Sequence, residues 1–338
     1  MEQEKLEQFA GHVESLGFIG LPLDRFYGAV RFFNVDGINV QNYRRSFGQD
    51  DVRYNLKFVA DDQRYPKLTG FEATLRHVPT IEHGIFRGID TAVLEENMRR
   101  INWRRGEKND PEPNSPPEDG ALLSDVFGKL NELSASDNPN VRRLADSLKV
   151  KYWSDTQMAI ASDLAEIIPQ FEKTHFFKVD GKFDDITAKD AYNLLSSRSV
   201  MKFEQVSQDN FVAYWLALEP SKQGLQLVRY DAFDLAESVK GLPLLEPSQK
   251  GFDLYQSVIE GNPVFAHVLI DGKRVMVSLS ADPKNKDVVL RDERGNSLPL
   301  EPLRMSQKES KRQKKGTPSG KPRLIKRKPP GKNRGRSM

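Results

Sequence analysis

The sequence contains no cysteine. This absence excludes disulfides, thiolate zinc sites, iron–sulfur clusters and cysteine nucleophiles in one step. It leaves the redox compartment open, because it only removes the residues that would argue for an oxidising one.

Long apolar runs are also missing. No stretch approaches the roughly 18 apolar residues that a membrane-spanning helix requires. The acidic start, MEQEK, lacks the cationic and then apolar pattern of a secretory signal. We therefore expect a cytoplasmic protein without a membrane span.

Catalytic motifs are absent from the sequence too. It has no G-x-x-x-x-G-K-[ST] phosphate loop, no G-x-G-x-x-G after a strand and no G-x-S-x-G nucleophile elbow. We therefore expect a protein that is not an enzyme and that uses no cofactor.

The charge is divided unevenly along the chain, whose net value is only +3. Residues 304–338 contain 14 Lys or Arg and one acid, Glu309, which gives a net charge of +13. The remaining 37 basic and 47 acidic residues give residues 1–303 a net charge of −10. Such a split indicates what the protein binds rather than how it folds.

The length of 338 residues is typical of two globular units. Residues 104–120 contain four prolines and no apolar side chain, so they cannot bury enough surface to become ordered. We expect an α+β fold made of two small α+β units with antiparallel strands. The expected parts are an N-terminal α+β domain at 1–103, a disordered linker at 104–120, a helical connector at 121–174, a C-terminal α+β domain at 175–303 and a disordered basic tail at 304–338.

Apolar spacing predicts the elements of the first two folded parts. Leu6, Phe9, Val13 and Leu16 have the helical period, and Gly17 is a plausible stop. Alternation over 52–59 and 71–75 predicts a hairpin of two strands. Further helices are expected at 90–101, 121–133, 141–150 and 156–168.

The C-terminal part has the clearest local signals. Thr187 and Asp190 predict a capped helix that ends near Arg198. Asp271-Gly272 between two apolar runs predicts a hairpin of residues 264–270 and 274–279. Other strands are expected at 211–218, 225–230 and 288–290, and other helices at 233–239 and 248–259.

Several segments resemble a known group of proteins. The segments are ITAKDAYNLL at 186–195, YWLAL at 214–218, GFDL at 251–254 and Gly261-Asn262, with FGQDDV at 47–52 and FEATL at 71–75. They resemble uncharacterised proteins encoded on bacterial conjugative and mobilisable elements, over roughly 1–101 and 175–303. The resemblance implies a mobile-element setting and a DNA-associated role, with no catalytic residue to transfer.

Three groups of residues are candidates for metal, acid–base or base-stacking sites. His77, Glu82 and His83 have a spacing that a metal site can use, but an ordinary loop with solvated or backbone-bonded imidazoles explains them better, and we predict no metal. The pairs Asp61-Asp62 and Asp184-Asp185 are expected to be turn residues rather than acid–base catalysts. The word AYWL at 213–216 fits either a base-stacking surface or, as we expect, a core strand.

The basic tail carries the main functional prediction. It lacks aromatic residues, so it is expected to bind phosphates without reading bases. We predict a non-enzymatic accessory protein associated with nucleic acid, whose acidic body contacts a protein partner. The residues predicted to contact nucleic acid are Lys311, Arg312, Lys314, Lys315, Lys321, Arg323, Lys326, Arg327, Lys328, Lys332, Arg334 and Arg336.

Other roles for the tail stay open. The protein is alternatively a protein–protein interaction adaptor whose tail only increases solubility. The tail is also able to fold back on the acidic body at low ionic strength. A role at a membrane surface is less favourable, because the prolines prevent a long amphipathic helix.

Overall fold

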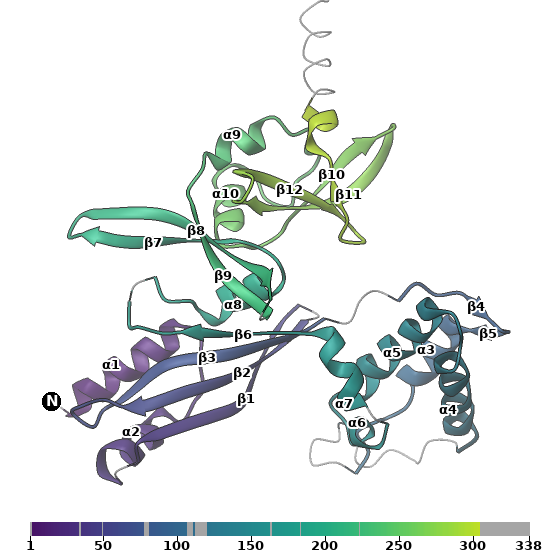
Figure 1. Cartoon of the computed structure of the whole chain (residues 1–338), viewed down its shortest axis with the longest axis horizontal. Coiled ribbons are helices and arrows are strands. Elements are labelled where there is room, and N and C mark those ends of the chain that lie inside the picture. The colour runs from purple at the N-terminus through teal and green to yellow at the C-terminus, as the bar shows by residue number, and fades with distance from the viewer. Residues whose placement is uncertain are drawn as a thin grey trace, which may run out of the picture.

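The computed structural model describes residues 2–33, 35–48, 50–77, 81–106, 111, 120–162, 164–182, 184–222 and 224–304. These residues form an α+β fold whose sheets are all antiparallel, as the sequence predicted. Within them, no helix is both long and apolar enough to cross a membrane. Figure 1 shows a lower sheet with its helices, a helical unit beside it and a C-terminal unit above it.

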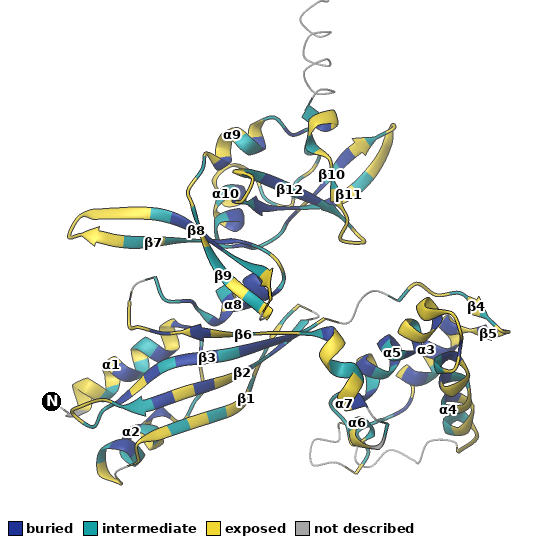
Figure 2. Ribbon diagram, viewed as in Figure 1, coloured by how far each residue is buried: buried dark blue, intermediate teal, exposed yellow. Residues whose placement is uncertain are grey.

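The first sheet has the strand order β1-β2-β3-β6. Val52, Tyr54, Leu56 and Phe58 are buried, and their neighbours along the strand are more exposed, so the predicted alternation is confirmed. Figure 2 shows this alternation. The elements are β1 (Gly37–Phe47), β2 (Asp50–Ala60), β3 (Pro66–Arg76) and β6 (Glu172–Lys178), with the helices α1 (Glu2–Ser15), α2 (Leu23–Phe32) and α8 (Ala188–Leu195).

Strand β6 crosses the expected domain boundary between residues 174 and 175. It pairs with β3, with Arg76 opposite Glu172, so the chain returns to the first sheet after the helical unit. Helix α8 contributes Ala188, Ala191 and Leu194 to the same core. Residues 172–195 therefore belong structurally with the N-terminal strands.

The helical unit lies between β3 and β6 in the sequence and has a core of its own. Residues 85–99 form its start, in which Asp90 caps α3 by accepting hydrogen bonds from the backbone N–H groups of Ala92 and Val93. The elements are β4 (Ile85–Phe86), β5 (Ile89–Asp90), α3 (Thr91–Arg99), α4 (Gly120–Ser134), α5 (Pro139–Trp153), α6 (Met158–Ala161), α7 (Leu164–Ile167) and a 3₁₀ turn (Ile168–Phe171).

The prediction of one helix over residues 156–168 was wrong. The segment forms α6, α7 and the 3₁₀ turn instead. Ile160 is exposed and Leu164 is fully buried. Because positions four apart share one face of a helix, an unbroken helix could not place these two side chains so differently.

The C-terminal unit contains two sheets, with orders β7-β8-β9 and β10-β11-β12-β13. Asp271 and Gly272 both have positive φ, 50° and 74°, and they form the predicted hairpin turn. The elements are β7 (Val200–Ser207), β8 (Asn210–Ser221), β9 (Gly224–Asp231), α9 (Leu235–Lys240), α10 (Gly251–Ile259), β10 (Val264–Ile270), β11 (Lys273–Asp282), β12 (Asp287–Asp292) and β13 (Ser297–Leu298).

Strand β8 connects the first core to the C-terminal core. Tyr214 and Leu216 pack into the first core, whereas Trp215 points to the opposite side and packs into the second. Because the side chains on both sides of this strand are buried, the AYWL segment is part of a core strand, as predicted. It is not a base-stacking surface, because Tyr214 exposes only 7% of its surface and Trp215 none.

Candidate functional site

The twelve basic residues predicted to contact nucleic acid, from Lys311 to Arg336, lie outside the described residues. So does most of the expected linker at 104–120, of which only 104–106, 111 and 120 are described. The structure therefore gives these predictions no geometry.

The last described residue, Arg304, is firmly held. Its guanidinium donates to both carboxylate oxygens of Asp287, at 2.8 and 2.6 Å, and to the Ser238 carbonyl at 2.9 Å. Its neighbour Leu303 is buried in the C-terminal core. Residues 300–304 are helical and lie on the side of the C-terminal unit that faces away from the first sheet, as Figure 1 shows. The basic segment thus begins at a fixed point.

His77 and His83, the histidines of the possible metal site, do not point toward a common centre. Nδ1 of His77 lies 3.4 Å from an oxygen of Asp50, and Nε2 of His83 lies 2.9 Å from an oxygen of Glu95. Glu82 faces Arg294 instead, at 3.7 Å. Among the described residues, no three His, Asp or Glu side chains form a group that could hold a metal ion.

Glu95 is a buried acid inside the helical unit. It accepts hydrogen bonds from Lys151 at 2.6 Å and from the Tyr152 hydroxyl at 3.0 Å. Burial alone would raise the pKa of Glu95, but these two hydrogen bonds and the charges of Lys151 and His83 together outweigh it and hold the pKa below its usual value. Glu95 therefore stays ionised, which suits a structural ion pair and not a general acid.

The two carboxylate pairs are turn residues, as predicted. Asp61 accepts backbone hydrogen bonds from Gln63 and Tyr65. Asp185 accepts three from the backbone N–H groups of residues 180–182, and Asp184 accepts one from the Tyr214 hydroxyl. The oxygens of Asp61 and Asp185 thus stabilise the local chain, and Asp184 holds the Tyr214 hydroxyl.

A cluster of cations forms where α8 ends. Ser197 adopts a left-handed conformation, with φ of 59°, and the N–H groups of Ser197 and Arg198 donate to the carbonyls of Leu194 and Asn193. This is the Schellman arrangement, which reverses the chain at the end of a helix. It turns Arg198 back over α8.

The direct contacts of Arg198 with the described residues are to neutral groups, although its charge also acts on Asp50. Its Nε donates to the Gly261 carbonyl at 2.8 Å, and one terminal nitrogen donates to the Asn193 side-chain oxygen at 2.7 Å. The guanidinium also lies over the ring of Tyr192, 4.8 Å from its centroid. These contacts fix the position of Arg198 without neutralising its charge.

Gly261 makes this arrangement possible. It has φ of 77°, and a Cβ atom there would lie 2.8 Å from Val200 Cγ1 and 3.0 Å from both Asn193 Cβ and the Ser199 carbonyl oxygen. Only glycine lets the turn after α10 approach α8 this closely.

Two further cations lie beside Arg198. Arg291, on β12, donates to the Ser280 hydroxyl at 3.0 Å, and Lys173, on β6, donates to the Ser197 hydroxyl at 2.9 Å. Burial and, more weakly, the charge of Arg198 lower the pKa of Arg291 against the opposing charge of Asp282. Burial and the charge of Arg291 lower the pKa of Lys173. Within the described part of the chain, no carboxylate oxygen lies within 4.0 Å of these three cations.

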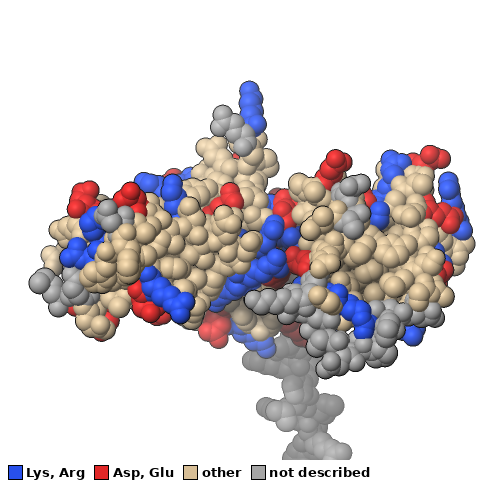
Figure 3. Space-filling view, turned by 90° about the horizontal axis from the view of Figure 1, so that it is seen from below, with Lys and Arg blue, Asp and Glu red and all other residues tan. Residues whose placement is uncertain are grey.

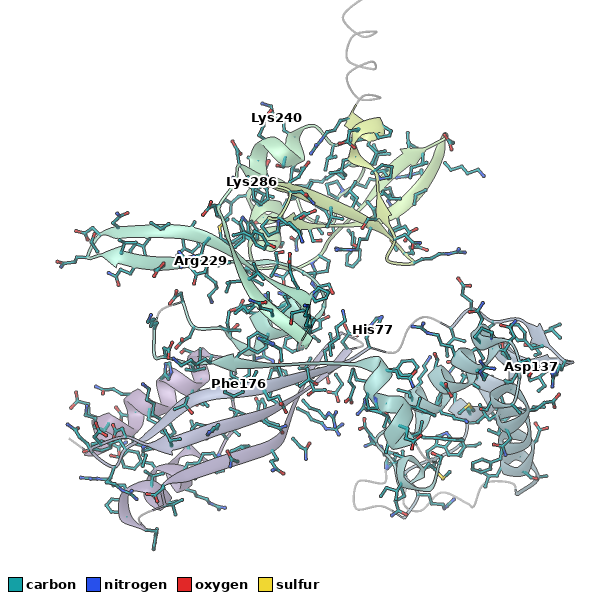
Figure 4. All side chains as sticks on the ribbon, in the orientation of Figure 1. His77, Asp137, Phe176, Arg229, Lys240 and Lys286 are labelled. Carbon is teal, nitrogen blue, oxygen red and sulfur yellow. The ribbon has the colours of Figure 1, made fainter. Side chains whose placement is uncertain are left out.

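Two adjacent cavities share Arg198 and Arg291 as lining residues, and we call them together the cation groove. One has a volume of about 590 Å³ and includes Ser199 in its lining. The other, of about 970 Å³, is lined on one side by the apolar residues Phe265 and Met276. His77 lines the larger cavity, and Figure 4 shows it near the place where the first sheet approaches the C-terminal unit.

Acidic residues also line the groove, but most are engaged elsewhere. Glu219 accepts hydrogen bonds from Tyr230 and Lys284. Asp282 accepts one from the Asn285 side chain at 2.8 Å, and Asp292 accepts several within its own turn. Their oxygens lie more than 4.0 Å from the three cations, although the charge of Asp282 still opposes the lowering of the Arg291 pKa.

Tyr192 lies beside an acid and a histidine. Its hydroxyl donates to Asp50 at 2.8 Å, and Asp50 also contacts His77. Burial and the bond to Asp50 raise the pKa of Tyr192, against the opposing effect of Arg198. A raised pKa makes the reactive phenolate less accessible.

A second arginine cluster, Arg44, Arg53 and Arg76, differs because it is fully paired. Arg44 and Arg76 bind Asp155 at 3.0 and 3.1 Å, and Arg76 also binds Glu172 at 3.0 Å. Figure 3 shows Lys and Arg next to acidic side chains where the first sheet meets the helical unit. We therefore assign this cluster to stability.

No family model matches the chain, and no curated protein or solved structure is significantly similar to it. The likeness to mobile-element proteins stays a prediction. The residues quoted for it include Tyr192, Asn193 and Gly261, which hold Arg198. Sequence reasoning missed Arg198, Arg291 and Lys173 as a group, because they come from three distant segments and form no local motif.

Proposed function

We propose that the protein is a non-enzymatic accessory protein that associates with nucleic acid through residues 304–338, in a mobile-element setting. The observation that carries the proposal is the charge of this segment, +13 with a single acid, on a body of −10. Concentrated cationic charge without aromatic residues suits phosphate contacts rather than base recognition.

The expected binding mode follows from counterion release. Each Lys or Arg that neutralises a phosphate of duplex DNA releases a condensed cation. If the segment engages about six phosphates, the logarithm of the affinity falls with the logarithm of the salt concentration with a slope of about −5. The binding is then largely independent of sequence.

The described body supports the proposal in two ways. Arg304 and Leu303 anchor the start of the segment to the C-terminal unit, so a bound nucleic acid is held close to the body. Arg198 and Arg291 of the cation groove, with Lys173 beside it, add three positive charges that have no carboxylate oxygen within 4.0 Å among the described residues.

The test replaces the twelve predicted residues with glutamine in the full chain, which lowers the charge of residues 304–338 from +13 to +1. We call this protein the segment-neutral variant. Fluorescence anisotropy with random-sequence duplex DNA, between about 50 and 200 mM salt, should give the steep slope for the natural protein and a shallow one for the variant.

A matched control keeps the composition of residues 305–338 but shuffles their order. It should bind like the natural protein, because charge and not sequence determines the affinity. Equal affinity and slope for the natural and segment-neutral proteins would contradict the proposal.

The alternative is a protein–protein interaction adaptor. It is favoured by the β7–β8 hairpin, which projects from the body in Figure 1 and exposes Phe203, Val206, Phe211 and Val212. Solvent-exposed apolar side chains grouped on one element are typical of interaction surfaces. An adaptor would show no steep salt dependence with DNA, so the same titration separates the two functions.

A further inference from the structure

We propose that the cation groove is a second nucleic-acid contact, which takes backbone phosphates of a single strand on Lys173, Arg198 and Arg291. This inference rests on the proposed function. It adds a preference for single strands, which residues 304–338 are not expected to have. Three observations on the described residues carry it: the cations that contact no carboxylate, the fixed geometry of Arg198 and the apolar wall.

The cations are the first observation. A partly buried cation without an anionic partner is costly, because the protein replaces only part of the hydration that the charge loses. Among the described residues, half-buried Arg291 donates to the Ser280 hydroxyl and feels the opposite charge of Asp282 from beyond 4.0 Å. The more exposed Lys173 donates to the Ser197 hydroxyl. A phosphate oxygen would give both side chains the charge-assisted hydrogen bonds that these hydroxyls do not supply.

The geometry of Arg198 is the second observation. Asn193, Gly261 and Tyr192 hold its guanidinium in place before any ligand arrives. A ligand therefore orders few side-chain torsions when it binds, which lowers the entropic cost of association. This rigidity distinguishes Arg198 from an ordinary surface arginine.

The apolar wall is the third observation, and it decides between a single strand and a duplex. Phe265, His267 and Met276 share one face of the β10–β11 pair, since His267 lies opposite Met276 and two residues from Phe265. Phe265 and Met276 expose 48% and 39% of their surface and line the larger cavity. Unpaired bases can stack on such side chains, whereas the bases of a duplex already stack on each other.

The test uses the segment-neutral variant, so that residues 304–338 contribute little. Two further changes are made in it, Lys173→Gln and Arg291→Gln, while Arg198 is kept because it also supports α8. The probe is a fluorescein-labelled oligothymidylate of about 12 nucleotides, within the usual site size for single strands. Each change should weaken its binding roughly tenfold, the effect of losing a charge-assisted hydrogen bond.

The matched control is Arg274→Gln. Arg274 lies on the neighbouring strand β11, is exposed and pairs with Glu246 at 2.7 Å. Its replacement should change oligothymidylate binding by less than about twofold, as expected for a surface ion pair. The inference is overturned if the two groove changes weaken binding no more than this control does.

A second variant separates loss of binding from loss of folding. Phe265→Ala removes an exposed ring, so thermal melting should be unchanged while oligothymidylate binding falls roughly tenfold and duplex binding does not. Equal loss for both probes, or none, overturns the inference. The inference is also overturned if inorganic phosphate raises the melting temperature in an Arg291-dependent way while oligothymidylate does not bind. The groove would then hold a small anion and not a nucleic-acid strand.

The two proposals fail in different ways. The proposed function fails when neutralising residues 304–338 leaves duplex binding unchanged. The groove inference fails when oligothymidylate binding does not depend on Lys173, Arg291 and Phe265, whatever the duplex shows.

Discussion

At the scale of single residues, the position of Arg198 depends on a glycine far away in the sequence. The Gly261 carbonyl accepts a hydrogen bond from Arg198, and the missing side chain of Gly261 gives Val200 and Asn193 their space. One backbone position thus controls both the packing of the turn after α10 against α8 and the direction of a cation.

Replacing Gly261 with alanine tests this dependence. The added Cβ meets three atoms at 2.8 to 3.0 Å, and the positive φ is unfavourable for alanine. We expect Gly261→Ala to lower the free energy of unfolding by about 2 to 4 kcal/mol, measured by urea denaturation.

Gly272→Ala is the control for Gly261→Ala. Gly272 has a similar φ of 74° but no atom within 4 Å of the added Cβ, so only the backbone strain of about 1 kcal/mol is expected. Equal costs for the two changes would show that contact with Val200 and Asn193 is unimportant.

At the scale of elements, patterns of neighbouring residues correctly predicted the features that depend only on neighbouring residues. Thr187 and Asp190 form the expected capping box, with hydrogen bonds of 3.1 and 3.0 Å. The strands at 52–59 and 71–75 pair as a hairpin, and Asp271-Gly272 forms the turn of the separate β10–β11 hairpin. Each of these features depends on residues that are close together in the sequence.

Features that depend on distant residues could not be predicted this way. Strand β6 was missed because it pairs with β3 across the whole helical unit. Helix α10 begins at Gly251, later than the expected Ser248, because the Ser248 N–H donates to the Phe265 carbonyl instead. Tertiary contacts overrode the local preference in these segments. The cation cluster joins β6, α8 and β12, so its members carry no common pattern.

The helical unit offers a prediction at this scale, because Glu95 connects α3 to α5. Replacing Glu95 with glutamine weakens its bonds to Lys151 and Tyr152 within a buried site. We expect the free energy of unfolding to fall by about 1 to 3 kcal/mol, from the loss of charge-assisted hydrogen bonds.

The neighbouring residue supplies the control for Glu95→Gln. Glu96 is exposed and pairs with Arg99 along the helix, so Glu96→Gln should cost less than about 0.5 kcal/mol. If the two changes have the same effect in chemical denaturation, the buried network does not stabilise the unit.

At the scale of the whole molecule, Arg76 joins the first sheet to the helical unit. It binds Asp155 and Glu172, and its side chain is 11% exposed. We expect Arg76→Gln to lower the free energy of unfolding at pH 7 by about 2 to 4 kcal/mol, because two partly buried carboxylates lose their main cation. The measurement is urea denaturation across a pH series.

The effect of Arg76→Gln should depend on pH with a definite sign. Burial tends to raise the pKa of Asp155, but the bonds from Arg44 and Arg76 outweigh this and lower it. A carboxyl with a lowered folded pKa stabilises the protein above its unfolded pKa of about 3.9, and the contribution is lost as the pH falls further. The difference between natural protein and variant should therefore narrow below about pH 4.

Arg44→Gln is the matched control, because Arg44 shares Asp155 but is more exposed. Its cost should stay below about 1 kcal/mol. A cost equal to that of Arg76→Gln, or a difference that does not shrink in acid, would contradict a role for Arg76 at this joint.

The pairing of β3 with β6 has a consequence for biosynthesis. Residues 77–171 must leave the ribosome before the edge of β3 can receive its neighbour. Until then, β3 presents unsatisfied backbone groups to other nascent chains, the situation in which strands aggregate. Because the helical unit has its own core, its early folding would bring Arg76 and Glu172 together and shorten that exposure.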